Sequence, residues 1–171
     1  MANQRGYIGL GSNLGERREQ ITRAIQLMQA MPGLEVDAVS SVYEAPPWGY
    51  QSEHKYLNAV AQVTWDSTPR MLLSTCRWIE AALGRKRSEE TQANCYTDRV
   101  IDLDILWLDG VEVRDGDFTL PHPRAHHRAF ALKPWLELAP ELELHGRPLG
   151  NWLAELSQEE VEHVELAGTL I

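Results

Sequence analysis

Cysteine and long apolar runs are scarce in this sequence. It contains two cysteines, Cys76 and Cys95, and their positions match neither a metal-binding spacing nor a disulfide framework, as is typical of a protein in the reducing cytosol. The N-terminal segment is polar and lacks the apolar stretch of a signal peptide. No apolar run approaches the length that crosses a membrane. We therefore expect a cytoplasmic protein without a membrane partner.

Positively charged residues are also few. The chain has 16 Lys and Arg against 25 Asp and Glu, a net charge of −9, which argues against nucleic acid or an anionic membrane as the main partner. The exception is a local basic cluster of Arg85, Lys86, Arg87 and Arg99. Such a cluster on an acidic protein indicates a small anionic ligand. We expect small-molecule substrates, no nucleic-acid partner and a monomer.

Repeats, low-complexity segments and domain boundaries are absent from the sequence. Its 171 residues, 43% of them hydrophobic, suffice for one substantial core, so we expect a single domain over residues 1–171. The glycine-containing loop at residues 11–15 lacks the Gly-Lys-Ser/Thr of a phosphate-binding P-loop. We expect it to be a tight connection from a strand to a helix.

Two aspartates interrupt an otherwise apolar segment at residues 99–108. Its branched residues predict a buried strand, on which alternation places Asp102 and Asp104 on one face with Leu106 and Leu108. Adjacent carboxylates are costly there unless a cation lies between them, and Mg²⁺ bound to substrate phosphates suits such ligands. A simply solvated face is the alternative, which we disfavour because both leucines would be exposed with the acids.

The hydrophobic periodicity predicts an α+β fold. The first six elements follow the order β-α-β-β-α-β, the ferredoxin-like arrangement, with an antiparallel-rich sheet and helices packed on one face. After them, Asp109-Gly110 predicts a hairpin, and Pro134 should break or restart a later helix. The expected strands cover residues 6–10, 34–44, 56–65 and 99–108, the expected helices cover 16–31, 67–83, 129–138 and 149–156, and residues 161–171 form an edge strand or a loose tail.

Several polar and aromatic residues leave two interpretations open. Tyr56 and Asn58 share a strand face and suit a flat heterocycle, although the spacing alone favours an ordinary cross-strand pair. Trp48, in the Pro-rich loop before them, either lines a planar ligand or packs on the body of the protein. Glu80 opposes the dipole at the end of its helix, which indicates either a function or pairing with Arg77 or Lys86.

Three histidines and two arginines lie close together at residues 122–128. We disfavour zinc, because no cysteine or carboxylate completes a ligand set. Positive and hydrogen-bonding groups around a phosphate fit this composition better. With the paired aspartates and the upstream arginines, the segment indicates phosphoryl-group transfer in a site that does not use a P-loop.

Taken together, the motifs resemble the 6-hydroxymethyl-7,8-dihydropterin pyrophosphokinase family of folate biosynthesis. The resemblance extends over nearly the whole chain, from Tyr7 to about Leu144. Each motif is short, and the specificity lies in their order and spacing. The segments that carry the resemblance are 11–14 (GSNL), 41–49 (SVYEAPPWG), 56–59 (YLNA), 80–87, 99–106, 120–130 and 138–142 (LAPEL).

The resemblance implies a Mg²⁺-dependent transfer of pyrophosphate from ATP. The hydroxymethyl oxygen would attack the β-phosphorus and release AMP, with Asp102 and Asp104 holding two Mg²⁺ ions and with Arg85 and Arg99 as further catalytic residues. Arg85 would lie on a mobile loop that closes over the reaction. No strong general base is implied, so positioning and charge neutralisation would supply the catalysis. The ATP-binding set would be Glu80, Arg87, Arg99, Ile105, Thr119, His122 and Arg128, and the pterin-binding set Ala45, Pro46, Pro47, Tyr56, Asn58, Tyr96 and Phe130.

One segment departs from the family pattern. Residues 95–99 read Cys-Tyr-Thr-Asp-Arg where the pattern is Arg-Trp-x-Pro-Arg, so Asp98 places a carboxylate beside Arg99. The preceding loop, residues 87–96, is also longer than in short members of the family. Two alternatives stay open: another Mg²⁺-dependent nucleotide-using transferase on a ferredoxin-like fold, and a pterin- or nucleotide-binding module without turnover.

Overall fold

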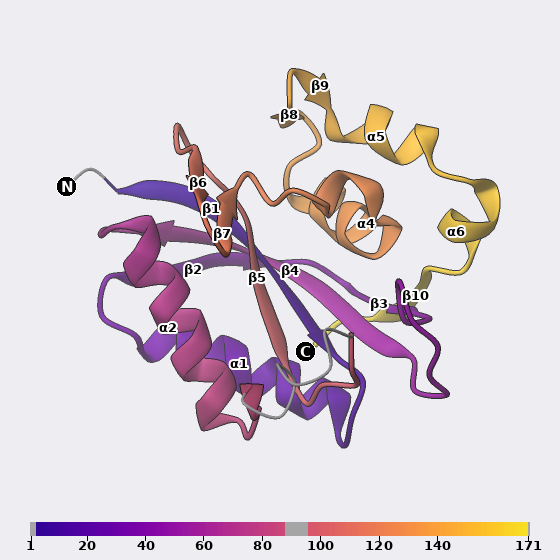
Figure 1. Cartoon of the computed structure of the whole chain (residues 1–171), viewed down its shortest axis with the longest axis horizontal. Coiled ribbons are helices and arrows are strands. Elements are labelled where there is room, and N and C mark those ends of the chain that lie inside the picture. The colour runs from indigo at the N-terminus through magenta and orange to yellow at the C-terminus, as the bar shows by residue number, and fades with distance from the viewer. Residues whose placement is uncertain (1–2, 88–95, 171) are drawn as a thin grey trace.

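The computed structural model describes residues 3–87 and 96–170. Its centre is a six-stranded sheet built from β1 (Gln4–Ser12), β2 (Leu34–Val39), β3 (Val42–Ala45), β4 (Tyr56–Trp65), β5 (Asp102–Leu108) and β10 (Glu165–Gly168). The strand order is β10-β3-β4-β1-β5, with β2 also paired to β4, and every pairing is antiparallel. The predicted ferredoxin-like α+β fold is confirmed (Figure 1).

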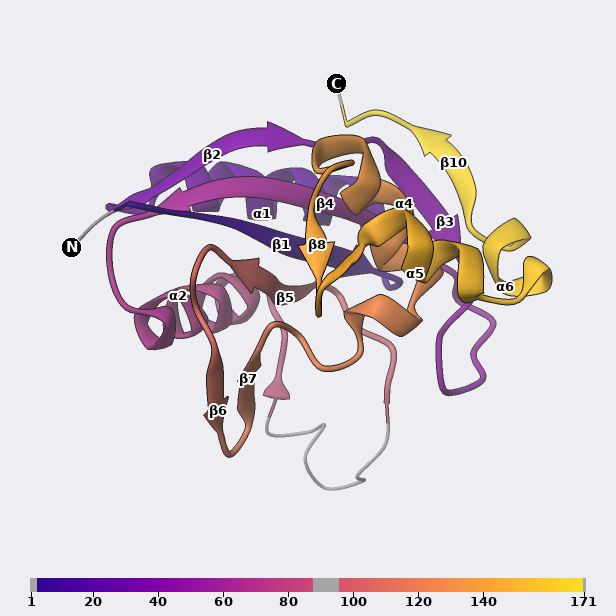
Figure 2. The same ribbon diagram turned by 90° about the horizontal axis from the view of Figure 1, so that it is seen from above.

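Helices cover both faces of the sheet. On one face, α1 (Arg17–Ala30) and α2 (Pro69–Ala82) form the larger core with β1, β4 and β5. On the other face, α4 (Ala129–Leu138) and α5 (Leu149–Glu155) pack over Tyr7, Val60 and Leu106. The two layers lie on opposite sides of the sheet in Figures 1 and 2. The expectation of helices on one face is therefore correct for the βαββαβ core and wrong for the whole chain.

Local chemistry explains the helix α2. The hydroxyl of Thr68 accepts a hydrogen bond from the backbone N of Met71 at 3.2 Å, and Pro69 occupies the first turn, where its missing N–H costs nothing. The helix presents Leu72, Cys76 and Ile79 to the core. Gly84, at φ +98°, follows its end. Cys76 is thus a buried core thiol.

The strand expected at residues 34–44 is in fact two strands. Ser40 interrupts it, because its Oγ accepts a hydrogen bond from the backbone N of Val60 at 2.9 Å. Between the pairs Val39↔Ala61 and Tyr43↔Asn58, this strand has one residue more than β4. The extra residue bends the chain, so β3 continues along β4 after an interruption.

A β-bulge changes the far end of β5. Tyr7 pairs with Trp107 but Ile8 pairs with Ile105, so Leu106 is the additional residue. Leu106 stays on the aspartate face, whereas Leu108 points into the core beneath α1 and α2. The expectation that Leu108 shares the face of Asp102 and Asp104 is therefore wrong.

The predicted hairpin is also displaced. The chain turns at Asp109-Gly110, but it does not return along β5. Instead β6 (Val113–Asp115) pairs with β7 (Phe118–Leu120) as a separate hairpin that contacts α2 through the Arg70–Asp115 ion pair.

The C-terminal part contains the two predicted helices, α4 and α5, together with short elements that were not expected. Helix α4 runs through Pro134 without a break, so Pro134 neither ends nor restarts it. The chain then forms β8 (Glu143–Leu144), β9 (Arg147–Pro148), α5, α6 (Gln158–Glu162) and the edge strand β10, and the 3₁₀ helix η1 (Ala125–His127) precedes α4. Across residues 3–87 and 96–170, no helix is long and apolar enough to cross a membrane.

Candidate active site

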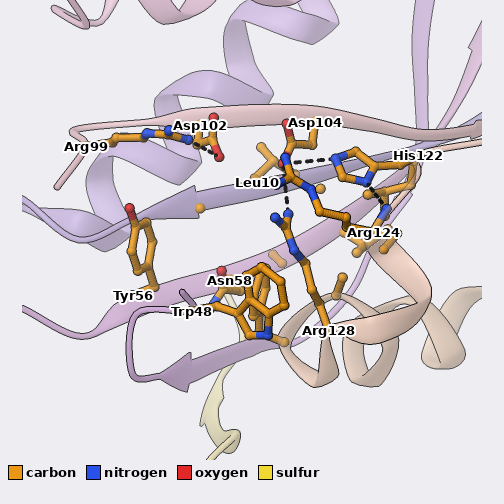
Figure 3. Close-up of a pocket in the computed structure, with 18 of the residues that line it drawn as sticks. Leu10, Trp48, Tyr56, Asn58, Arg99, Asp102, Asp104, His122, Arg124 and Arg128 are labelled. Atoms are coloured by element: carbon orange, nitrogen blue, oxygen red, sulfur yellow. Dashed lines mark hydrogen bonds and ion pairs between the residues drawn. The ribbon is translucent and has the colours of Figure 1, made fainter. Parts of the chain in front are cut away.

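A pocket of about 170 Å³ opens on the face of the sheet that carries α4 (Figure 3). Its floor comes from β1, β4 and β5, and its walls come from the β3–β4 loop, residues 96–99 and the segment 122–131. Gly11 of β1 keeps the floor open, since a Cβ there would lie 3.3 Å from Asn58 Oδ1 and 3.5 Å from the Tyr56 ring. Polar and aromatic lining residues include Trp48, Tyr50, Tyr56, Asn58, Tyr96, Arg99, Asp102, Asp104, His122, Arg124, Arg128 and Phe130.

Asp102 is neutralised by arginines on two sides. Its carboxylate accepts hydrogen bonds from Arg85 Nη1 at 2.6 Å and from Arg99 Nη1 at 3.0 Å. Burial by itself would raise the pKa of Asp102, but the two guanidinium groups outweigh it and hold that pKa below its usual value. Asp102 is therefore charged and compensated in the ligand-free protein.

Asp104 faces the same pocket with far less compensation. Its Oδ2 lies 4.0 Å from both His122 Nε2 and Arg128 Nη1, which is too far for a direct hydrogen bond. Poor solvation and the neighbouring Asp102 carboxylate raise the pKa of Asp104 to about 7. The pair thus holds one compensated carboxylate and one that a cation would stabilise.

The carboxylate pair suits an ion that shares ligands with a substrate. The described residues contain no group of three or more His, Cys, Asp or Glu side chains able to hold a metal by themselves. Two carboxylates on one strand face fit Mg²⁺, which keeps water or phosphate oxygens in the rest of its coordination shell.

Behind Asp102, Glu80 organises the arginines. Its side chain is 1% exposed, and Oε1 accepts hydrogen bonds from Arg85 Nη1 at 2.7 Å and from the backbone N of Leu103 at 2.8 Å. Oε2 accepts one from Arg87 Nη2 at 2.6 Å. Burial still raises the pKa of Glu80 above its usual value, although these partners oppose the shift. Of the two partners expected for Glu80, Arg77 instead pairs with Asp117, so the Arg77 alternative is wrong.

His122 is a neutral hydrogen-bond donor at the pocket wall. Burial, with Arg128 and Arg124 nearby, lowers the pKa of His122 to about 4. Its Nδ1 accepts a hydrogen bond from the backbone N of Arg124 at 3.1 Å, so the ring proton resides on Nε2, the atom directed toward Asp104. Arg124 and Arg128 therefore supply the positive charge of this wall.

The opposite end of the pocket is aromatic. Tyr56 and Asn58 of β4 line it together with Phe130 of α4, and Arg128 lies 4.6 Å above the Trp48 ring. Asn58 is 5% exposed, and its buried Nδ2 has no hydrogen-bond partner among the described residues. Since buried polar groups are normally satisfied, this donor indicates that an acceptor on a flat ligand belongs here.

The predicted site residues divide into three groups by position. Those that line the pocket are Pro46, Tyr56, Asn58, Tyr96, Arg99, Asp102, Asp104, His122, Arg128 and Phe130. Glu80, Arg85 and Arg87 form the layer behind Asp102. The remainder do not line it: Ala45 is buried, Pro47 lines a neighbouring pocket, the Ile105 side chain points into the α1–α2 core, and Thr119 lies on β7.

Sequence reasoning missed Tyr50 and Arg124 as pocket residues, although both lie in segments that it marked as loops near the site. The sequence features that could have indicated them are the aromatic residues of the β3–β4 loop, which contains Tyr50, and the His/Arg segment, which contains Arg124. Residues 88–95, which include Cys95 and most of the loop expected to be longer and mobile, lie outside the described residues.

Comparison with known proteins identifies related sequences and folds. The profile of the family described as 7,8-dihydro-6-hydroxymethylpterin-pyrophosphokinase (HPPK) matches residues 7–140. The chain is 40% identical over 161 residues to the 2-amino-4-hydroxy-6-hydroxymethyldihydropteridine pyrophosphokinase of Methylorubrum extorquens, covering 94% of this chain and 99% of that protein. It is 33% identical to the protein of the same name from Bacillus subtilis, covering 82% of this chain and 81% of that one.

Solved structures share the fold at low sequence identity. An HPPK-DHPS in complex with substrates superposes with a TM-score of 0.69 at 10% identity, covering 90% of this chain and 43% of that one. Wild-type Plasmodium falciparum HPPK-DHPS with pteroate gives a TM-score of 0.67 at 11% identity, with 90% and 44% coverage. The chain spans less than half the length of these solved chains, and at such identities the likeness shows the fold alone.

Proposed function

The chain belongs to the 7,8-dihydro-6-hydroxymethylpterin-pyrophosphokinase family, and from this premise we propose how its pocket carries out the reaction of folate biosynthesis. Pyrophosphate passes from ATP to the hydroxymethyl group of 6-hydroxymethyl-7,8-dihydropterin, and AMP leaves. The family and the curated relatives support the pyrophosphokinase activity. The assignment of residues to steps rests on the pocket geometry.

The aromatic end binds the pterin. The rings of Tyr56 and Phe130 pack on the flat heterocycle, and the unpaired Asn58 amide donates to an acceptor on its edge. Pro46, Tyr96 and Trp48 complete the wall. This places the hydroxymethyl group toward the carboxylate end of the same pocket.

The carboxylate end binds the metal and the phosphates. Asp102 and Asp104 are the residues that hold Mg²⁺, which when bound neutralises the negative charge of the ATP phosphates. Arg99 and Arg128 line the pocket beside them, and His122 adds a neutral N–H donor. Arg85, held by Glu80 and bonded to Asp102, adds a further positive charge at this end.

The chemical step is an in-line displacement at phosphorus. The hydroxymethyl oxygen forms a bond to the β-phosphorus, the bond from that phosphorus to the oxygen of the α-phosphate breaks, and the hydroxyl proton is lost to solvent as AMP departs. The arginines and His122 stabilise the charge that develops on the phosphate oxygens. Alignment of the two substrates in one pocket supplies the remaining acceleration.

The observation that carries this proposal is the carboxylate pair facing the same pocket as the unpaired Asn58 amide. The test incubates the protein with ATP, Mg²⁺ and hydroxymethyldihydropterin and separates the nucleotide products. AMP is expected. ADP, or no turnover of this alcohol, contradicts the proposal.

A pair of variants isolates the carboxylates. Asp102→Ala should abolish AMP formation while the circular dichroism spectrum stays that of the wild type. Asp109→Asn, an exposed carboxylate just beyond β5, is the matched control and should retain activity. Retained activity in Asp102→Ala overturns the metal assignment. The proposal includes a cytoplasmic monomer acting on small molecules.

A further inference from the structure

Asp98 connects three segments that are distant in the sequence. Its Oδ1 accepts hydrogen bonds from Asn13 Nδ2 at 2.8 Å and from the Tyr50 hydroxyl at 3.0 Å, and its Oδ2 accepts one from Ser52 Oγ at 2.9 Å. Asn13 follows β1, while Tyr50 and Ser52 belong to residues 46–55, the β3–β4 loop that we call the pocket loop. One carboxylate therefore ties this loop to the edge of the site.

The base of this connection is rigid. Asn13 is buried, its Oδ1 accepts a hydrogen bond from the backbone N of Arg99 at 2.6 Å, and its own backbone N donates to the Arg99 carbonyl at 3.0 Å. Its Nδ2 also donates to the His54 carbonyl at 3.1 Å. Asp98 is thus anchored beside Arg99, a pocket residue that bonds Asp102.

The hydrogen bonds continue from Asp98 to the aromatic end of the pocket. The hydroxyls of Tyr50 and Tyr56 lie 3.0 Å apart. Since Tyr50 donates its one hydroxyl proton to Asp98, the Tyr56 hydroxyl is the donor toward Tyr50, and it shares that proton with the Thr97 carbonyl at 3.3 Å. The chain Tyr56–Tyr50–Asp98 therefore fixes the ring of Tyr56, which lines the pocket.

Ring packing holds the pocket loop in the same place. Tyr50 stacks on Tyr96 with ring centroids 6.3 Å apart and planes 13° apart, and Trp48 meets Tyr96 edge-on at 6.4 Å. Stacking alone permits sliding and rotation of the rings, because it has a shallow preferred geometry. The directional bonds to Asp98 remove that freedom.

We propose that Asp98 is a positioning residue that holds the pocket loop closed in the ligand-free protein and, through Tyr50, orients Tyr56 for the pterin. The identity of the ligand in this inference rests on the proposed function, whereas the role of Asp98 in holding the pocket loop does not. Holding the wall in its binding conformation lowers the ordering cost of binding. We expect Asp98 to affect the affinity for the pterin and not the affinity for ATP.

Hydrogen exchange of the ligand-free protein tests the loop without reference to activity. Asp98→Asn removes the charge, Asp98→Ala removes all three acceptor contacts, and Tyr50→Phe keeps the stacking ring but removes the link to Tyr56. We expect faster amide exchange across residues 46–55 in all three, most in Asp98→Ala. The control is Glu53→Gln, an exposed carboxylate of the same loop, which should exchange like the wild type.

Calorimetry with the pterin and with an ATP analogue tests the positioning role. Asp98→Ala should weaken pterin binding roughly tenfold, the loss expected for hydrogen bonds to a charged group, with ATP-analogue affinity unchanged. Unchanged loop exchange in Asp98→Ala, or equal losses for pterin and ATP analogue, overturns the inference. Failure of the wild type to bind the pterin would overturn the proposed function, while the exchange comparison would still decide whether Asp98 holds the loop.

Discussion

At the scale of single residues, the two aspartates of β5 differ in their electrostatic surroundings. Asp102 has two arginines in hydrogen-bonding contact, whereas the nearest side-chain nitrogens of Arg128 and His122 lie 4.0 Å from Asp104. Alternation along a strand predicts their common face, but it says nothing about which carboxylate is compensated. That difference comes from Glu80 and the arginines, which reach the strand from elsewhere in the chain.

The pH dependence of stability should separate the two aspartates. The pKa of Asp104 rises from 3.8 to about 7 on folding, so the folded protein binds this proton more tightly and stability falls as pH rises through that window. Asp104→Asn should therefore raise the melting temperature more at pH 8 than at pH 5 in the absence of ligand. Asp102, whose pKa is lowered, should behave oppositely, with Asp102→Asn lowering the melting temperature at pH 8. Equal shifts at both pH values for Asp104→Asn would contradict this account.

The Asn58 amide should contribute to pterin binding but not to the stability of the fold. Its Nδ2 is buried without a partner among the described residues, so removing the amide costs the folded state little. We expect Asn58→Ala to keep the wild-type melting temperature within the error of the measurement but to weaken pterin binding roughly tenfold, as loss of a hydrogen bond in a closed site does. Isothermal titration gives the second quantity. An unchanged pterin affinity would show that the amide has another purpose.

At the scale of elements, the predictable parts are those that local chemistry specifies. The helix α2 follows from Thr68, Pro69 and a stripe of apolar residues, and β4 follows from its alternation. The break between β2 and β3 depends on the bond from Val60 to Ser40, a contact 20 residues away in the sequence, and no periodicity reveals it. The bulge at Leu106 and the unbroken helix through Pro134 are likewise set by neighbouring elements.

The last turn of α2 should be the most sensitive part of that helix. Glu80 is a buried partner of Arg85, whose side chain is 2% exposed and which also pairs with Asp102. Glu80→Ala should lower the free energy of unfolding by about 3 kcal/mol, the low end for breaking a buried ion pair, because Arg85 keeps Asp102 as a partner while the Leu103 N–H loses its acceptor. Arg77 lies on the same helix, and Arg77→Ala, which removes its exposed pair with Asp117 of the β6–β7 turn, should change the free energy of unfolding by less than about 1 kcal/mol. Urea denaturation measures both, and similar effects of the two variants would refute the buried-pair argument.

At the scale of the molecule, the pocket exists because the second helical layer covers only part of the sheet. Helix α4 packs over β3 and β4 on that face, with α5 packed on α4, and the aspartates and Tyr56 lie on the floor that α4 leaves open (Figures 1 and 3). The lining comes from residues 9–11, 46–60, 96–106 and 122–131, so no single segment predicts the site. The resemblance of ordered motifs identified most of the polar and aromatic residues of the lining, whereas Tyr50, Arg124 and the contacts of Asp98 required the folded chain.

The C-terminal segment should depend on one lysine of α4 for its place in the molecule. Lys133 Nζ donates hydrogen bonds to the carbonyls of Val161 at 2.6 Å and Val164 at 2.7 Å, just before β10 pairs with β3. Lys133→Met keeps the apolar stem but removes both bonds, so we expect a loss of about 2 kcal/mol in unfolding free energy. Amide exchange over residues 157–168 should accelerate, while exchange in β1 and β4 should follow global unfolding alone. Lys55→Met, at an exposed position of the pocket loop, should change neither quantity. Unaltered exchange in residues 157–168 of Lys133→Met would mean that β10 and the packing of Val164 hold this segment without the lysine.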